Sequence, residues 1–203
     1  MRSSRWPDGT GPRWPRRALL GAAALAGLPR WASAAEAEPL LREGGVVIAF
    51  RHALAPGTFD PPEFRLGDCR TQRNLSDGGR AQARRIGEWF ESRRLVPARV
   101  RSSPWCRCLD TAQLAFGRAE AWPALGSPRG ASESTNAESL AALRQAVVQA
   151  SRERGRFEAW VTHMFVLSDL VATGSSSGEG LVLRADARGS LQVLARLAPP
   201  PAG

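Results

Sequence analysis

The sequence contains no lysine: all 28 of its basic residues are arginine, against 19 acidic residues in a chain of 203. The formal net charge of +9 overstates the basic character, because six arginines and only one acid, Asp8, fall within the first 34 residues. The remainder has 22 basic and 18 acidic residues and shows no basic stripe interleaved with aromatics. This mild excess argues against nucleic acid as a partner.

Long apolar runs are also lacking. The mild apolar run over residues 18–28 has eleven residues, short of the roughly 20 needed to span a bilayer. It follows a pair of arginines and precedes two A-x-A cleavage patterns between residues 32 and 37. We therefore expect residues 1–34 to be an export signal of the twin-arginine or the Sec type, cleaved near 34–37. The mature protein would be periplasmic, with no membrane span.

Cysteine is scarce, and Cys69, Cys106 and Cys108 are the only three, so at least one is unpaired. An exported protein can form disulfides. Cys106 and Cys108 are too close in sequence to bridge each other comfortably, which leaves Cys69 with one of the two. The spacing does not fit a metal site, because the two histidines lie far from the cysteines in sequence.

The rest of the sequence predicts one domain over residues 38–197, followed by a disordered tail at 198–203. Apolar runs predict strands over 44–50, 96–102, 119–125, 157–162, 180–184 and 190–194. Capping patterns and apolar periodicity predict helices from Ser76 to 95, from Ser103-Pro104 to 116, from the Thr135–Glu138 capping box onward, and over 164–172. Strands that alternate with helices favour a three-layer α/β/α domain around a mostly parallel central sheet.

Two loops are distinctive. Residues 55–69 are rich in Pro, Gly and Asp and predict a long loop of the kind that often lines a site. Residues 174–178, "GSSSG", match the G-x-S-x-G pattern, but a helix is predicted before them and no histidine follows. The context of a nucleophile elbow is therefore missing, and we interpret the segment as a flexible loop.

Both histidines of the chain end an apolar run. Arg51-His52 follows the first predicted strand, and His163 follows the strand over 157–162. Arg107 falls in the first turn of the helix predicted after Ser103, where free N–H groups favour an anion. Ligands collect beyond the carboxyl ends of strands in open α/β sheets. A histidine at a strand end is more often structural, but two in the same topological position, with arginines, predict a site for a dianionic phosphate.

Three segments in this order carry a family resemblance: "FRHA", "SSPWCRCLDTA" and "VTH". They resemble the Arg-His-Gly motif, the Ser-Pro-x-x-Arg-x-x-x-Thr-Ala helix start and the second histidine of the histidine phosphatase superfamily. The segment "GDCRTQRNLSDGGRAQARRIG" is similar to the family's Leu-Ser/Thr-x-x-Gly-x-x-Gln-Ala segment. The resemblance covers about residues 40–195 and implies a phosphoglycerate-mutase-like fold.

The resemblance implies a phosphoric monoester hydrolase that acts on a small phosphorylated substrate and needs no metal or organic cofactor. His52 would attack phosphorus to form a phosphohistidine, which water then hydrolyses. Arg51, Arg107 and His163 would hold the phosphoryl oxygens, with further contacts from Thr58 and from the backbone N–H of Met164. We expect the pKa values of the two histidines to be pushed apart, with His52 neutral and His163 protonated.

The sequence departs from the family pattern at several places. Ala53 replaces the glycine of the first motif, and an asparagine common in the family is replaced near Thr58. Met164 follows the second histidine where a small or polar residue is common, and no acid lies in residues 125–127, where the family often has a glutamate.

Glu133 is the nearest candidate for the general acid, although it also fits a solvated loop carboxylate; Asp60 and Glu63 are alternatives. These departures support a second reading, a catalytically degenerate module of the cell envelope that binds phosphate or a phosphosugar.

Cys69 and Cys106 both flank the pocket that the resemblance implies. We expect them to form a disulfide that pins the long loop near Arg107, with Cys108 as a small core residue. The other reading is that all three thiols are buried. The sequence carries no signal for an oligomeric state.

Overall fold

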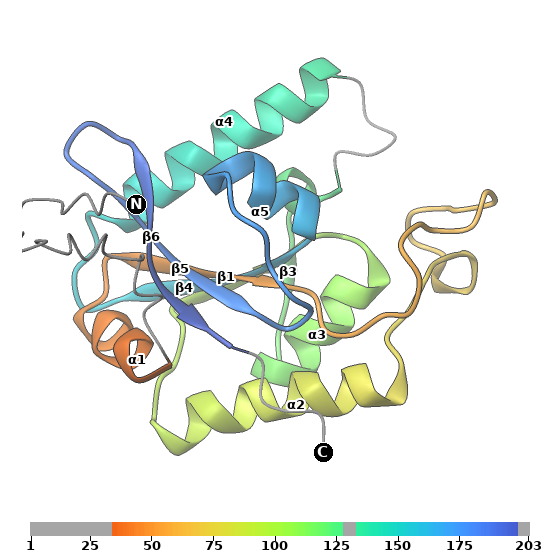
Figure 1. Cartoon of the computed structure of the whole chain (residues 1–203), viewed down its shortest axis with the longest axis horizontal. Coiled ribbons are helices and arrows are strands. Elements are labelled where there is room, and N and C mark those ends of the chain that lie inside the picture. Colours follow the sequence, from red (N-terminus) through yellow and green to blue (C-terminus); the bar gives the residue numbers. More distant parts are fainter. Residues whose placement is uncertain (1–33, 128–132, 199–203) are drawn as a thin grey trace, which may run out of the picture. The chain divides into compact units, whose positions relative to one another are not determined.

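The computed structural model describes residues 34–127 and 133–198, and the side chains of 34, 35 and 133–135 are outside this description. Its centre is a six-stranded sheet with the strand order β3-β2-β4-β1-β5-β6 (Figure 1). The strands are β1 (Val46–Arg51), β2 (Arg99–Ser102), β3 (Glu120–Ala121), β4 (Phe157–Thr162), β5 (Gly180–Ala185) and β6 (Leu191–Leu197). The pairs β1–β4, β4–β2 and β2–β3 are parallel, and β5 and β6 add antiparallel pairs. The predicted mostly parallel sheet is confirmed.

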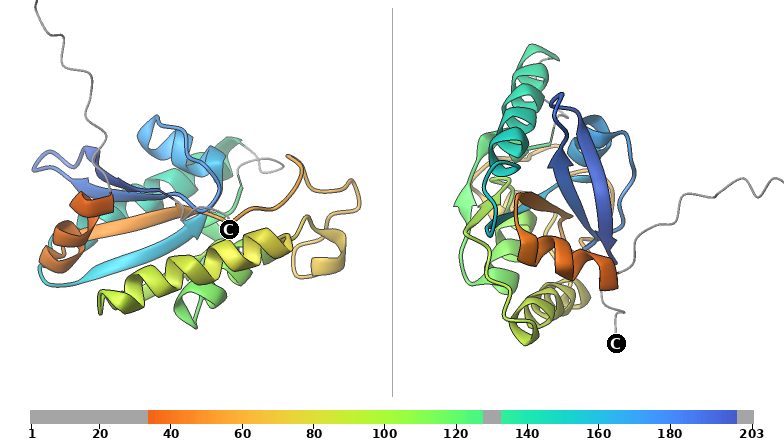
Figure 2. Two further views of the ribbon diagram at one scale, coloured as in Figure 1. Left: turned by 60° about the horizontal axis from the view of Figure 1, so that its bottom comes forward. Right: turned by 90° about the vertical axis from the view of Figure 1, so that its left-hand side faces the viewer.

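Helices cover both faces of this sheet (Figure 2). One face carries α1 (Ala34–Glu43), α2 (Asp77–Ser92) and α3 (Cys106–Phe116), and the other carries α4 (Glu133–Ala150) and α5 (Met164–Val171). The alternation of side chains along β1 explains the two cores. Ile48 and Phe50 pack in the core with α1, α2 and α3, whereas Val47 and Ala49 pack with α4 and α5. The three-layer prediction is therefore confirmed.

Helix α1 was not predicted from the sequence. Ala37 and Leu41 are buried and belong to the core cluster that includes β1. The predicted cleavage range, 34–37, falls on the first turn of this helix. Residues 1–33 of the expected signal and 199–203 of the expected tail lie outside the described residues. No described helix is long and apolar enough to cross a membrane.

The predicted start of α3 is wrong. The helix begins at Cys106 with Trp105 as its N-cap residue, not after a Ser103 cap. The Oγ of Ser103 instead lies 2.8 Å from Nε2 of His163, and it accepts a hydrogen bond from the N–H of Trp105 at 3.3 Å.

Other boundaries also shift. The strand predicted over 119–125 shortens to β3 followed by a 3₁₀ turn, η2 (Pro123–Leu125), because Pro123 has no N–H to donate to a sheet. Similarly, β2 begins only at Arg99, beyond Pro97. Helix α4 begins at Glu133, before the predicted start at Thr135. By contrast, Ser76 caps α2 as predicted, since its side chain accepts a hydrogen bond from the N–H of Gly79.

Candidate active site

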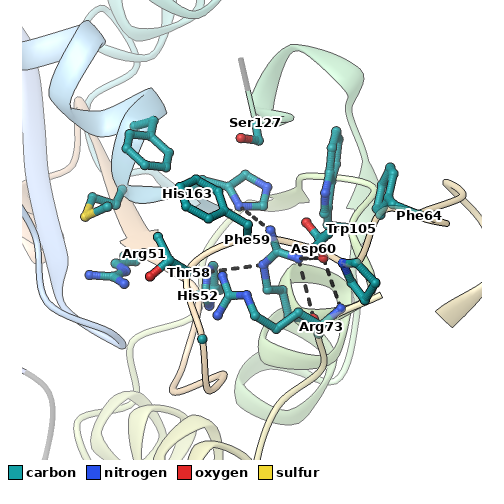
Figure 3. A pocket seen from close by; sticks show the side chains of 15 residues that line it. Arg51, His52, Thr58, Phe59, Asp60, Phe64, Arg73, Trp105, Ser127 and His163 are labelled. Atoms are coloured by element: carbon teal, nitrogen blue, oxygen red, sulfur yellow. Dashed lines mark hydrogen bonds and ion pairs between the residues drawn. The ribbon is translucent and has the colours of Figure 1, made fainter. Parts of the chain in front are cut away.

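A cavity of about 340 Å³ lies beyond the carboxyl ends of the parallel strands (Figure 3). Because β1, β2 and β4 run in the same direction, their last residues meet at one edge of the sheet. The charged or titratable side chains that line the cavity are Arg51, His52, Asp60, Arg73, Arg107 and His163. The structure therefore brings together both histidines and both arginines that the sequence analysis selected.

His52 is buried and held in one tautomer. Its Nδ1 lies 2.8 Å from the carbonyl oxygen of Ala53, which can only accept a hydrogen bond, so Nδ1 carries the proton. The Nε of Arg107 donates to Nε2 of His52 at 3.3 Å. Burial lowers the pKa of His52 to about 3, and the charges of Arg107, Arg73 and Arg51 act in the same direction, whereas the bond to Ala53 opposes them. His52 is therefore a neutral imidazole whose unprotonated nitrogen, Nε2, accepts the hydrogen bond from Arg107.

Alanine in place of the family's glycine at position 53 causes no backbone strain. Among the described non-glycine residues, only Arg94 and Ala172 have a positive φ. Ala53 is fully buried, and its N–H donates to Oγ1 of Thr111 at 3.0 Å.

His163 is the N-cap residue of α5, and its ring faces the same arginine. A terminal nitrogen of Arg107 lies 3.4 Å from Nδ1 of His163. Since arginine only donates, Nδ1 is the acceptor and Nε2–H donates to Ser103. Burial lowers the pKa of His163 well below its usual value, and the charges of Arg107 and of His52 add to this effect.

The expectation that His163 is protonated is therefore wrong. Both histidine pKa values move down, because both rings are buried beside the same arginines. A bound dianion would favour the charged form of each ring and raise both pKa values.

Arg107 links the charged groups of the site. It is only 3% exposed, and one terminal nitrogen lies 2.8 Å from Oδ1 of Asp60. Burial alone would raise the pKa of Asp60, but hydrogen bonds from the N–H of Arg73 and from Arg107 outweigh it and lower this pKa. Asp60 is therefore ionised and cannot readily donate a proton.

Arg73 is a site residue that the sequence analysis missed. It lies within the segment that resembles the family, just before Asn74-Leu75-Ser76, and this position was the only available signal. Its guanidinium lines the cavity and donates to the carbonyl of Ala55. Arg51 likewise lines the cavity and donates to the carbonyl of Ser175 at 2.9 Å. Burial lowers the pKa of both arginines.

The "GSSSG" segment, which we predicted to be a flexible loop, contacts the end of β1. The Ser175 carbonyl holds the side chain of Arg51, and the N–H of Gly178 lies 3.1 Å from the carbonyl oxygens of Arg51 and His52. The segment positions the end of β1.

The remaining predicted site residues have different placements. Thr58 and Met164 line the cavity, and Met164 is the first residue of α5. The first N–H groups of a helix have no partner within it, so this end can receive an anion. Ser127 lines the cavity where the family often has its glutamate. The side chain of Glu133 is outside the described residues, and Glu63 is exposed and does not line the cavity.

The predicted disulfide Cys69–Cys106 is present. It joins the short turn η1 (Cys69–Thr71), which ends the long loop, to the first residue of α3. Cys108 is a free, buried thiol, and burial raises its pKa to about 12. In the described part of the chain, no group of three or more His, Cys, Asp or Glu side chains is placed to hold a metal ion.

Comparison with known proteins gives a partial family-model match and a fold. The family model of the histidine phosphatase superfamily (branch 1) matches residues 63–129, which include Arg73 and Arg107. No curated protein matches the chain. The protein histidine phosphatase SixA, solved with tungstate, is similar in structure with a TM-score of 0.51 at 19% identity, over 76% of this chain and 97% of that one.

Two further solved structures have the same fold. An open reading frame product of Mycobacterium tuberculosis has a TM-score of 0.54 at 17% identity, over 76% of this chain and 97% of that one. A mycobacterial glucosyl-3-phosphoglycerate phosphatase has a TM-score of 0.52 at 17% identity, over 75% of this chain and 98% of that one. At these identities the likeness bears on the fold.

Proposed function

We propose that this chain, of which residues 63–129 match the family model of the histidine phosphatase superfamily, hydrolyses a phosphomonoester through a phosphohistidine intermediate on His52. The observation that carries the proposal is the neutral His52, whose Nε2 lone pair lies in a cavity with Arg51, Arg73 and Arg107. Such a ring is a nucleophile, and the arginines supply donors for phosphoryl oxygens.

The proposed reaction has two steps. In the first, Nε2 of His52 forms a bond to phosphorus while the bond to the leaving oxygen breaks, and that oxygen keeps the electron pair. In the second, water attacks the phosphohistidine, the P–N bond breaks, and its electron pair returns to Nε2. The attacking water loses a proton to solvent, and inorganic phosphate leaves. Arg107 contacts both histidines, so it is placed to bind phosphoryl oxygens through both steps.

The possible substrates differ in how strongly their leaving group depends on a proton donor in the site. The one carboxylate among the described residues that line the cavity is Asp60, which is ion-paired with Arg107. A leaving group that departs as a weak base needs little help from an acid. The proposal therefore favours substrates with good leaving groups.

We also propose that the protein acts after export to the periplasm. The N-terminal signal pattern supports this placement, and so does the Cys69–Cys106 disulfide, since disulfides persist in oxidising compartments.

The test is detection of the phosphoenzyme. The protein is mixed with an aryl phosphate and quenched, and acid-labile phosphate is mapped to one of the two histidine-containing peptides. Label on His52, lost in His52→Gln together with turnover, would support the proposal. His163→Gln is the matched control, because it removes the other histidine and leaves the nucleophile. Phosphate binding without label or turnover in the wild type would refute hydrolysis and favour the phosphate-binding module.

A further inference from the structure

The mouth of the cavity is aromatic. Phe59 and Phe64 come from the long loop after β1, and Trp105 immediately precedes α3 (Figure 3). Phe64 and Trp105 are stacked, with ring centroids 5.4 Å apart and an interplanar angle of 20°. Trp105 in turn lies edge-on to His163, at 5.3 Å. An aromatic wall therefore runs from the loop directly to the charged floor of the cavity.

Phe59 is notable because of its exposure. The residue is 61% exposed although it lines the cavity. Exposing a large ring to water costs free energy that a bound apolar group recovers. The apolar lining also includes Met164 and Phe165.

Few groups at this mouth can bind the hydroxyls of a sugar. Among the described lining residues, Thr58 and Ser127 carry the only hydroxyl side chains. Oδ1 of Asp60 is already engaged by Arg107 and by the N–H of Arg73. A polyhydroxylated leaving group would therefore lose water contacts that these residues replace only in part.

Resting on the proposed phosphatase activity, we propose that the substrate is an aryl phosphomonoester whose leaving group is a phenol, with its ring held by Phe59 and the Phe64–Trp105 pair. Two independent features support this class. The wall suits a ring, and the only carboxylate among the described lining residues, Asp60, is ion-paired with Arg107, which suits a weakly basic leaving group. A phenol has a pKa of about 10, whereas the pKa of an aliphatic alcohol is far higher, close to that of water.

The bond changes balance without a protein acid. When Nε2 of His52 attacks phosphorus, the P–O bond to the ring oxygen breaks and phenolate departs with the electron pair. Solvent then protonates the phenolate outside the cavity.

The test compares four phosphates that separate the ring from the leaving group. Phenyl phosphate has both a ring and a good leaving group, and benzyl phosphate has a ring with a poor one. Acetyl phosphate has a good leaving group without a ring, and glycerol 2-phosphate has neither. We expect kcat/KM to be highest for phenyl phosphate. Benzyl phosphate should form the phosphoenzyme much more slowly, and acetyl phosphate should turn over with a raised KM.

A variant pair tests the role of the wall. Phe59→Ala should raise KM for phenyl phosphate by about 3- to 10-fold and leave KM for acetyl phosphate unchanged. Leu66→Ala is the matched control, because Leu66 lies on the same loop, is 54% exposed and does not line the cavity. It should leave KM unchanged for both substrates.

The outcomes distinguish the inference from the proposed function. Equal or faster turnover of benzyl or glycerol 2-phosphate, with phosphohistidine on His52, would overturn the aryl class and leave the phosphatase intact. The same would follow if Phe59→Ala changed KM equally for phenyl and acetyl phosphate. No turnover of any of the four and no phosphohistidine would refute the phosphatase, and the inference with it.

Discussion

The two histidines predict an unusual loss of stability at mildly acidic pH. Both are buried and neutral, with the pKa of His52 lowered from 6.5 to about 3 and that of His163 lowered well below 6.5. The unfolded chain takes up a proton on each ring as the pH falls below 6.5, and the folded chain does not. The free energy of unfolding is therefore highest above pH 6.5, and it decreases progressively as the pH falls toward the folded-state pKa of each histidine.

The magnitude follows from the linkage relation. Between pH 7 and pH 5, each histidine that stays neutral in the folded state costs roughly 2 kcal/mol of unfolding free energy. The pair would therefore cost about 4 kcal/mol, a large part of the 5–15 kcal/mol typical of a domain. Carboxylates contribute little in this window, because their ordinary pKa values lie near 4. These are the only histidines in the sequence, so the window isolates them.

The assay is urea unfolding followed by tryptophan fluorescence at pH 7, 6 and 5, in phosphate-free buffers and with the disulfide intact. The wild type should lose about 4 kcal/mol across the series, and His52→Gln/His163→Gln should be nearly flat whatever its absolute stability. A wild-type loss below about 1 kcal/mol, or an equal slope in the double variant, would show that the folded histidines titrate normally.

Three further predictions concern the arginine, the disulfide and the contact to His163. Arg107→Lys should lower kcat/KM for phenyl phosphate by about 10²- to 10³-fold, and a loss under tenfold would contradict its central position. Cys69→Ser/Cys106→Ser should lower the free energy of unfolding by about 3–4 kcal/mol in urea, because the bond spans 37 residues; an unchanged midpoint would contradict this. Ser103→Ala should lower kcat by about tenfold with little change in KM, and Ser103→Thr should restore kcat. An unchanged kcat in Ser103→Ala would show that the hydroxyl does not orient His163.

Much of the fold and part of the site were predictable because the signals are local. Continuous apolar residues predicted β1 and β4, and the histidine after each strand needed no tertiary information. Parallel pairing then places His52 and His163 at one edge of the sheet. The N-cap at Ser76 was equally local, since its partner Gly79 lies within the same turn.

What the sequence could not predict depends on partners far along the chain. Ser103 has the pattern of an N-cap, but its hydroxyl contacts a histidine 60 positions away. Arg73 and Asp60 lie on a loop without periodicity, and only the folded loop places them beside Arg107. The pKa of His163 follows from the same cause, because burial and neighbouring charges are tertiary properties.

The charges that line the cavity connect phosphate binding to the freeing of Nε2 of His52. Within the described residues, Arg107 is paired with Asp60, whereas the side chains of Arg51 and Arg73 donate to backbone carbonyls. The cavity therefore keeps unneutralised positive charge for a dianion. The Nε–H of Arg107 also occupies the lone pair of His52 at 3.3 Å, a long hydrogen bond. A phosphoryl oxygen is a stronger acceptor than a neutral imidazole. Under the proposed function, Arg107 exchanges His52 for that oxygen, so binding itself exposes Nε2 for attack.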